Sequence, residues 1–402
     1  MKKRIPYLSF TACLIIVCVG HFIVDFMIGI WPIYKMMMGF DLAKAGIMVG
    51  VAAALGEGIQ FVSGPGTDKG FGKALAIGGI ILATSAVFLA FTHNPTAWLC
   101  LIVLTYLGSG FFHPAAGGLL GMLPTKRLSL LMGLFAASGT FGMSLSQLVF
   151  SKAYSISLVM VLVLTIPTAV LALWGFFQRS YMVVVGDETE SNSQTKKFDF
   201  QAFGRLVRDH RFLLLYVALL TTQIIFWSVI FLLPDLLQSR RYPSWLCLGS
   251  GHLVFMLGSS VITIVAGWLA DRFSSTKVMI AAFSLGLPCC YIIAYMPNLS
   301  VGLMLLCLFF LGGACYSITP VGIAFGNRLM PGSPGLVNAC LMGMVWAVSE
   351  SVSPLGSGLL ASLFHANAPG KALGIMGALL FVGLWCSLLL EAKTRRPVMA
   401  EA

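Results

Sequence analysis

Long, almost uninterrupted runs of apolar residues recur along the whole chain, with short polar segments between them. Each run is long enough to cross about 30 Å of hydrocarbon as a helix of about 20 residues. The runs are apolar around most of their circumference, whereas a surface helix of a soluble protein carries one apolar stripe. We therefore predict an all-α membrane protein with twelve spanning helices. The predicted ranges are 8–33, 41–63, 74–92, 96–121, 129–150, 155–178, 212–237, 246–269, 277–297, 300–325, 335–362 and 371–391.

The composition excludes a soluble enzyme. Of the 402 residues, 58% are hydrophobic and 10% are charged, whereas a soluble domain carries about 25% charged residues. Too few ionic groups are present to cover a surface in water. The ten cysteines lie in or beside apolar runs and show no Cys-x-x-Cys or Cys/His spacing, so we expect neither a metal site nor a cofactor.

The longest polar stretch, 179–211, separates the sixth predicted span from the seventh. We interpret it as a cytoplasmic linker between two six-helix bundles, residues 1–178 and 212–402. The first apolar run follows three basic residues, as in a signal peptide, but no small-residue cleavage site follows it. We expect this run to remain in the protein as the first span.

Basic residues are distributed unevenly between the two sides of the predicted membrane topology. With a cytoplasmic N-terminus, six of the 25 fall outside and the other nineteen fall inside, none of them deep in a span. The six are Lys35, Lys44, Lys152, Arg240, Arg241 and Lys371. Because cytoplasmic loops are enriched in lysine and arginine, both termini are predicted to be cytoplasmic in a multi-pass cell-membrane protein. The net charge of +11 therefore reflects topology rather than nucleic-acid binding.

A repeat divides the chain into two similar halves. The segment 64–69 closes the second predicted span, and 267–272 closes the eighth, 203 positions later. Gly110 and Gly313 are separated by the same interval. Duplicated six-helix halves are typical of secondary transporters, in which the halves rock about a shared site.

Both copies of this repeat contain the pattern Gly-x-x-x-Asp followed by a basic residue. Glycine allows a helix end to pack closely, and the acid can cap a neighbouring helix N-terminus, where the helix dipole favours negative charge. The pattern resembles the loop motif of the major facilitator superfamily, and the resemblance implies a conformational latch for the outward-facing state. The matching residues are Gly64, Asp68, Lys69 and Lys73, and Gly267, Asp271, Arg272 and Lys277.

The first 145 residues or so also resemble the fosmidomycin-resistance type of drug exporter within that superfamily. The resemblance implies proton-driven export of small toxic compounds. It rests on His21-x-x-x-Asp25, Trp31-Pro32, Gly46, Gln60, the run 108–114 (Gly-Ser-Gly-Phe-Phe-His-Pro) and the run 138–142 (Ser-Gly-Thr-Phe-Gly).

Ionisable residues within spans are costly unless they serve a function. His21 and Asp25 are one helical turn apart and share a face, so they are candidates for proton coupling; the alternative is a static pair that holds span one to span four. Glu57 in span two and Glu350 in span eleven are further candidates. In the expected fold these two helices meet at the interface between the halves, and a structural role for either acid remains open.

Several other residues are candidates for lining a substrate cavity. His113 precedes Pro114, which frees a backbone carbonyl one turn earlier, so its side chain either satisfies that break or lines the cavity. The other candidates, which could equally be packing residues, are Phe112, Gln60, Phe226, Trp227 and Trp346.

No phosphate-binding loop or hydrolase motif is present, which argues against an ATP-driven pump or an enzyme. The leading prediction is a monomeric, proton-coupled exporter of a small organic compound, working by alternating access within the lipid bilayer. A proton-coupled nutrient importer is the alternative, and a membrane enzyme or channel is a third possibility. An anionic substrate is disfavoured, because Asp25, Glu57 and Glu350 make the cavity acidic and no basic residue lies in mid-span.

Overall fold

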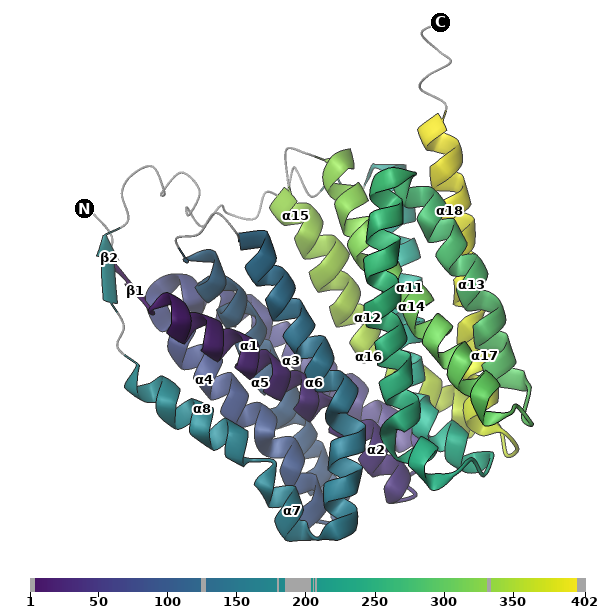
Figure 1. Ribbon diagram of the computed structural model, residues 1–402, viewed down its shortest axis with the longest axis horizontal. Coiled ribbons are helices and arrows are strands. Elements are labelled where there is room, and N and C mark those ends of the chain that lie inside the picture. Colours follow the sequence, from purple (N-terminus) through teal and green to yellow (C-terminus); the bar gives the residue numbers. More distant parts are fainter. Residues whose placement is uncertain are drawn as a thin grey trace, which may run out of the picture. The chain divides into compact units, whose positions relative to one another are not determined.

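The computed structural model describes residues 4–123, 128–178, 181–184, 204, 206, 208–330 and 334–395. Within these residues, twelve helical segments are long and apolar enough to cross a membrane (Figure 1). Their ends agree with the predicted ends to within six residues, which confirms the predicted fold class. The segments are Phe10–Met37, Leu42–Gly66, Lys69–Phe91, Pro95–Gly121, Leu131–Ile156, Leu158–Phe177, His210–Ser239, Leu246–Arg272, Ser275–Tyr295, Val301–Leu329, Leu336–Ser362 and Ala368–Lys393.

The chain forms two compact units, Met1–Met37 with Val51–Phe198, and Met38–Gly50 with Asp199–Ala402. The elements up to β2 are β1 (Arg4–Tyr7), α1 (Phe10–Ile28), α2 (Ile30–Met37), α3 (Leu42–Gly66), η1 (Thr67–Phe71), α4 (Gly72–Ala83), η2 (Thr84–Phe91), α5 (Pro95–Gly121), α6 (Leu128–Ile156), α7 (Leu158–Val163), α8 (Ile166–Phe177) and β2 (Tyr181–Val184). The elements that follow are α11 (His210–Ser239), η3 (Leu246–Ser250), α12 (Gly251–Arg272), α13 (Ser275–Tyr295), α14 (Val301–Leu329), α15 (Pro334–Asn338), η4 (Ala339–Met344), α16 (Val345–Ser362), α17 (Ala368–Gly377) and α18 (Leu379–Arg395).

Helix α3 is divided between the two units because its N-terminal part packs within the second unit. A Cβ atom at Gly46 would meet the carbonyl oxygen of Pro354 and the Cα of Gly358 on α16. Glycine therefore permits two helix backbones to touch at this point.

Side-chain caps mark several helix starts. Asn94 Oδ1 accepts a hydrogen bond from the backbone N–H of Thr96 (2.9 Å), and Pro95 occupies the first position of α5. Asp209 Oδ1 accepts one from the N–H of Arg211 (2.8 Å) at the start of α11. Such caps satisfy N–H groups that lack partners within the helix.

A glycine crossing recurs in both units. In the first, Gly56 of α3 and Gly110 of α5 lie against each other, and a Cβ at Gly110 would meet the carbonyl of Gly56. In the second, a Cβ at Gly258 of α12 would meet the carbonyl of Phe309, and one at Gly312 would meet the carbonyl of Phe255. The crossings are 202 positions apart, so the predicted duplication also holds in helix packing.

Two features differ from the sequence predictions. Lys35, expected in an outer loop, lies fully buried in α2, because the first span continues to Met37. A short antiparallel ribbon also pairs β1 with β2, with Arg4 opposite Val184, although we expected only helices. A ribbon of four-residue strands has little apolar alternation to reveal it in the sequence.

Candidate functional site

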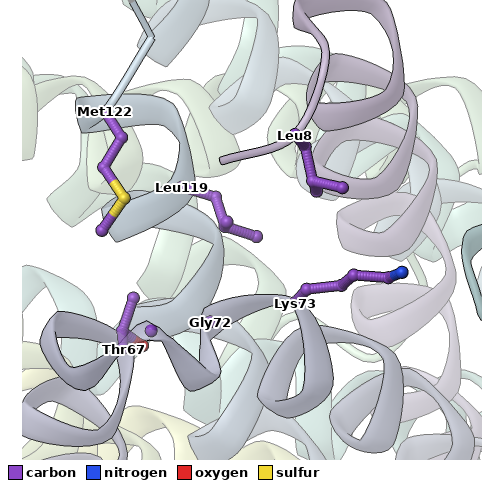
Figure 2. Close-up of a pocket in the computed structure, with 7 residues that line it drawn as sticks. Leu8, Thr67, Gly72, Lys73, Leu119 and Met122 are labelled. Carbon is purple, nitrogen blue, oxygen red and sulfur yellow. The ribbon is translucent and has the colours of Figure 1, made fainter. Parts of the chain in front are cut away.

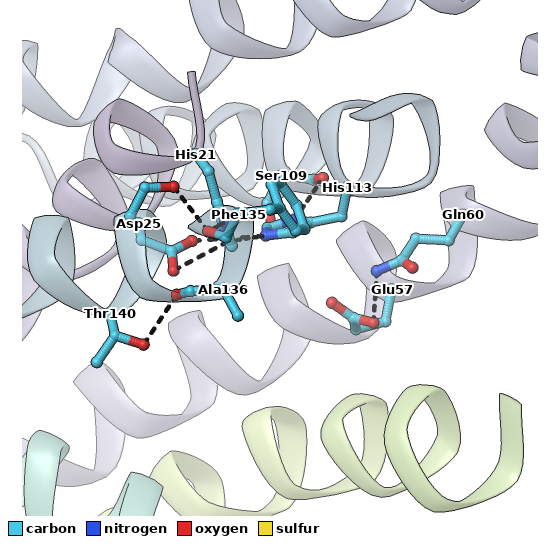
Figure 3. A network of polar contacts seen from close by, with 10 residues as sticks. His21, Asp25, Glu57, Gln60, Ser109, His113, Phe135, Ala136 and Thr140 are labelled. Carbon is cyan, nitrogen blue, oxygen red and sulfur yellow. Dashed lines mark hydrogen bonds and ion pairs between the residues drawn. The ribbon is translucent and has the colours of Figure 1, made fainter. Parts of the chain in front are cut away.

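Three polar side chains from two helices meet inside the first unit (Figure 3). His21 and Asp25 project from α1, and His113 projects from α5. The Nε2 atom of His21 lies 3.3 Å from Asp25 Oδ2, and that of His113 lies 3.5 Å from Asp25 Oδ1. The two Nε2 atoms are 3.1 Å apart. The predicted pair His21 and Asp25 is therefore joined by His113, which the sequence suggested only as a cavity residue.

The other nitrogen of each ring faces a backbone carbonyl. His21 Nδ1 lies 2.7 Å from the carbonyl oxygen of Phe135 on α6, and His113 Nδ1 lies 3.0 Å from that of Ser109 on α5. A carbonyl oxygen only accepts hydrogen bonds, so His21 Nδ1 carries a hydrogen and donates it to Phe135, and the Nε2 of the neutral His21 ring presents a lone pair. His113 Nδ1 also lies 3.0 Å from the hydroxyl of Ser109, which can donate to this nitrogen or accept from it.

Apolar rings enclose the cluster on one side. Phe135 stacks on His21 with ring centroids 3.9 Å apart. Phe112 is fully buried and packs against His21 at 6.0 Å. Phe112 is therefore a core residue in this structure, although the sequence suggested it for the cavity. His21 is 5% exposed, while the side chains of Asp25 and His113 keep 18% and 22% exposure, so only those two reach beyond the packed layer.

Helix α6 approaches the cluster through glycine. A Cβ atom at Gly139 would meet His21 Nε2 and Asp25 Oδ2, and one at Gly142 would meet the carbonyl of Phe22. Both glycines belong to the run 138–142 on which the drug-exporter resemblance rests. The structure brings that run, the His21-x-x-x-Asp25 pattern and His113 to one place.

Proline shapes the helix that carries His113. Pro114 lacks an N–H, so the Gly110 carbonyl one turn earlier loses its helical partner. The hydroxyl of Ser63 on α3 donates a hydrogen bond to this carbonyl (2.8 Å). Ser63 thus satisfies the break, and His113 is left for the cluster.

Glu57 and Gln60 form a separate pair on α3. Gln60 Nε2 donates to Glu57 Oε2 at 2.6 Å, and both side chains are partly exposed. Figure 3 shows the pair beside the cluster, with no hydrogen bond drawn between the two groups. The first unit therefore contains two partly exposed carboxylates, those of Asp25 and Glu57.

The aromatic residues of the second unit that we considered for the substrate cavity lie in a cluster of aromatic rings. Phe226 on α11 contacts Trp227, Phe255 and Tyr316 with ring centroids 5.1–5.9 Å apart. Phe226 is 3% exposed and is mainly a packing residue. Trp227 is partly exposed.

Other polar groups of the second unit are buried. Gln223 Nε2 on α11 donates to Thr319 Oγ1 on α14 at 2.7 Å, a pair that sequence reasoning missed. Trp346 Nε1 is buried without a hydrogen-bond partner among the described residues. Glu350 on α16 is 7% exposed. Gln223 could not be singled out because glutamine is uncharged and only its pairing across two helices distinguishes it.

The loop motif of the first unit holds two helices together at one end of the unit. Lys73 Nζ donates to the carbonyl oxygens of Phe176 (3.0 Å) and Gln178 (2.5 Å), at the C-terminus of α8. The stem of Lys73 lines a small hollow with Thr67 and Leu119 (Figure 2). A cation at a helix C-terminus is favourable because the dipole is negative there. Lys73 therefore acts as a helix cap, a role that the sequence did not predict.

Close packing at the motif glycines was predicted incorrectly. A Cβ at Gly64 or Gly267 would meet no atom within 4 Å. The glycine that the first loop requires is Gly70, whose φ of 95° lies in the region that residues with a Cβ rarely adopt. Lys69 is exposed, and the side chain of Asp68 lies outside the described residues.

The second copy of the motif is exposed. Asp271 and Lys277 are exposed, and Arg272 lies over the ring of Trp268 at 5.4 Å. The start of α13 is instead held by other residues, because Thr276 donates to Glu391 of α18 and Arg328 donates to Ser275. The two copies of the motif therefore make different contacts.

The chain matches the model of one protein family, the Major Facilitator Superfamily, over residues 17–250 and 244–401. No curated protein matches the chain.

Solved structures with similar folds are transporters. A bacterial homologue of the human lysosomal transporter Spinster, in an inward-facing and occupied conformation, is 13% identical, with a TM-score of 0.77 over 95% of this chain and 96% of that one. The nucleoside transporter NupG is 14% identical, with a TM-score of 0.69 over 95% of this chain and 98% of that one. At these identities the likeness concerns the fold alone.

Proposed function

The chain belongs to the major facilitator superfamily, and we propose that it is a proton-coupled transporter that exports a small organic compound by alternating access. We place the coupling site at His21, Asp25 and His113. We also propose that both termini face the cytoplasm, that the protein works in the cell membrane, and that its relationship to the fosmidomycin-resistance exporters extends to the direction of transport.

The observation that carries this proposal is the contact of an acid with two imidazole rings inside a membrane-spanning unit. The two Nε2 atoms lie 3.1 Å apart beside a carboxylate, so a hydrogen on one of them can be shared with the other ring. One additional proton on the pair of rings balances the charge of Asp25. Loss of that proton leaves the cluster negatively charged, and a conformational change that rewets the site would favour its uptake again.

The charge around this cluster favours a neutral or cationic substrate. Glu57 and Asp25 are both partly exposed, so their region attracts cations. Lys35, near the end of the first span, is fully buried and offers no surface to an anion. An anionic phosphonate would need arginine or lysine donors, and the hydrogen bonds and ion pairs described for Glu57 and Asp25 involve only glutamine and histidine.

Reconstituted transport tests the proposal directly. Purified protein in liposomes is supplied with ethidium, a fluorescent organic cation, and a proton gradient is imposed in either direction. We expect saturable ethidium movement against the proton flux, and no movement of fosmidomycin. Movement with the proton flux would indicate an importer instead, and saturable movement that ignores the gradient would contradict proton coupling.

A further inference from the structure

We propose that His21, Asp25 and His113 form a binding site for one divalent transition-metal ion of the zinc class. The proposal concerns the same cluster but goes beyond the proposed transport function, and it rests on geometry alone. Sequence spacing gave no sign of a metal site, because His113 lies 92 positions from His21 along the chain.

The separations of the ligand atoms fit a zinc ion. Zinc binds imidazole nitrogen at about 2.0–2.1 Å in tetrahedral geometry, so that two ligand atoms lie about 3.4 Å apart. In the cluster, the two Nε2 atoms are 3.1 Å apart, His21 Nε2 lies 3.3 Å from Asp25 Oδ2, and His113 Nε2 lies 3.5 Å from Asp25 Oδ1, so each ring faces its own oxygen of the carboxylate. The three residues are also the one His/Cys/Asp/Glu group with metal-site spacing in the described part of the chain.

The hydrogen bonds behind the two rings are those of a metal site. A histidine ligand commonly donates its second ring N–H to a carbonyl, which fixes the ring and directs the free lone pair at the metal. The carbonyl oxygens of Phe135 and Ser109 occupy these positions for His21 and His113. With the hydrogen of each ring on Nδ1, both Nε2 atoms are free to bind one ion; the hydroxyl of Ser109, 3.0 Å from His113 Nδ1, is a second group that can hold this ring.

The ligand types select the class of ion. Two imidazoles and a carboxylate suit zinc and its transition-metal neighbours, whereas calcium and magnesium require mostly oxygen ligands. Three protein ligands leave one tetrahedral position open. The partial exposure of Asp25 and His113 (18% and 22%) provides a side from which water can fill it.

Helix α6 leaves space beside the ligands. Gly139 faces His21 Nε2 and Asp25 Oδ2, and a single methyl group there would contact both atoms. Gly139→Ala is therefore expected to displace the ligand atoms from their common point, although all three ligands are retained.

Direct metal analysis tests the site. The protein is purified in detergent without a polyhistidine tag, dialysed against zinc chloride and then against metal-free buffer, and analysed by mass spectrometry. We expect one zinc ion per chain in the wild type. Replacement of zinc by cobalt(II) should give the intense visible absorption of a tetrahedral cobalt site, an observation that requires no variant.

Matched variants locate the ion. His21→Asn, His113→Asn and Gly139→Ala should each weaken zinc binding by at least about 10-fold. His93→Asn is the control, because His93 is an exposed loop histidine and its loss should leave one ion bound. Size-exclusion profiles and helix content identify variants that fail to fold. No bound zinc and no cobalt spectrum in the wild type would overturn the proposal, as would equal binding in His93→Asn and His113→Asn.

Transport separates this proposal from the proposed function. Because a metal ion occupies the lone pairs that a proton would take, zinc should inhibit proton-driven ethidium movement in the wild type; this step alone rests on the proposed function. If zinc binds at the cluster and transport continues unchanged, the metal site stands and proton coupling at this cluster is wrong.

Discussion

The two units share a pattern of helix packing but differ in the polar side chains that the packed helices carry. The crossing of Gly56 with Gly110 in the first unit recurs as that of Gly258 with Gly312 in the second. The residues of the polar cluster are not repeated. At the offset of 202 residues that relates the two glycine crossings, the positions equivalent to His21, Asp25 and His113 are Gln223, Trp227 and Cys315.

This difference suggests that the two duplicated halves have different chemical roles. The first unit holds a carboxylate between two imidazoles, whereas α11 of the second presents the neutral pair Gln223 and Thr319 and an aromatic cluster around Phe226. Backbone packing constrains the glycines equally in both units, because any side chain there would displace a helix. In the second unit, Gln223, Thr319 and Phe226 are buried, and so is the acid Glu350.

The largest effect should come from removing the charge that distinguishes the first unit. Asp25→Asn keeps the shape of the side chain but cannot balance a proton on His21 or His113. Ethidium transport driven by a proton gradient should fall to the level of protein-free liposomes. Exchange at equal pH on both sides should continue, because it requires no net proton transfer.

Two controls sharpen this result. Ser228→Ala removes a buried hydroxyl from α11 of the second unit and should leave gradient-driven transport at the wild-type level. Glu350→Gln tests the buried acid of the second unit, and should also leave it intact. If Glu350→Gln rather than Asp25→Asn abolishes transport, the coupling site belongs to α16 and the comparison fails.

The next largest effect concerns the glycine crossings that the two units share. Gly56→Ala and Gly258→Ala should each destabilise the protein by about 1–3 kcal/mol, because the new Cβ meets a backbone carbonyl. Thermal-shift midpoints should fall by about 2–4 °C per kcal/mol. Gly267→Ala is the control, since open space surrounds that position, and its midpoint should rise slightly as the helix loses a flexible glycine. Equal midpoints for Gly258→Ala and Gly267→Ala would contradict the crossing.

A smaller effect distinguishes the two motif copies. Lys73→Ala removes the cation at the C-terminus of α8 and should cost about 0.5–2 kcal/mol. Lys277 is exposed, so Lys277→Ala should change stability by at most about 0.5 kcal/mol. Thermal-shift midpoints of the two variants, measured side by side, decide whether the copies differ in stability as they do in contacts.

The smallest effect tests the proposed latch. Asp68→Asn should shift the population toward the inward-facing state by about 0.3–1 kcal/mol, whereas Asp271→Asn should not, because Asp271 is exposed. Spin-label distances between the C-terminal end of span two and the N-terminal end of span eleven report this shift. Identical distance distributions in wild type and Asp68→Asn would leave Asp68 without a latch role.

The spans could be predicted because each is a local run of apolar residues. The pair His21 and Asp25 could be predicted because helical spacing places both residues on one face. The third member of the cluster could not. His113 reaches Asp25 only because α1 packs on α5, and its ring is directed by a carbonyl of its own helix. Contacts of this kind depend on the packing of helices distant in sequence, which no local pattern records.

The burial and contacts of lysine residues near the ends of spans could not be predicted from local sequence patterns either. Lys35 is fully buried although a single lysine beside an apolar run normally indicates a loop. The cap formed by Lys73 depends on where α8 ends, about 100 residues away. The φ of Gly70, in contrast, was within reach, because a glycine between two helices often marks such a turn.

Gly139 also has an evolutionary consequence. A glycine codon becomes an alanine codon through one nucleotide change, and that change would add a methyl group at the contact with His21 and Asp25. A lineage could thereby lose ion binding in one step while every ligand residue stayed in its sequence. We therefore expect homologues that carry both histidines and the aspartate, but have alanine at this position, to keep the three side chains without binding the proposed ion.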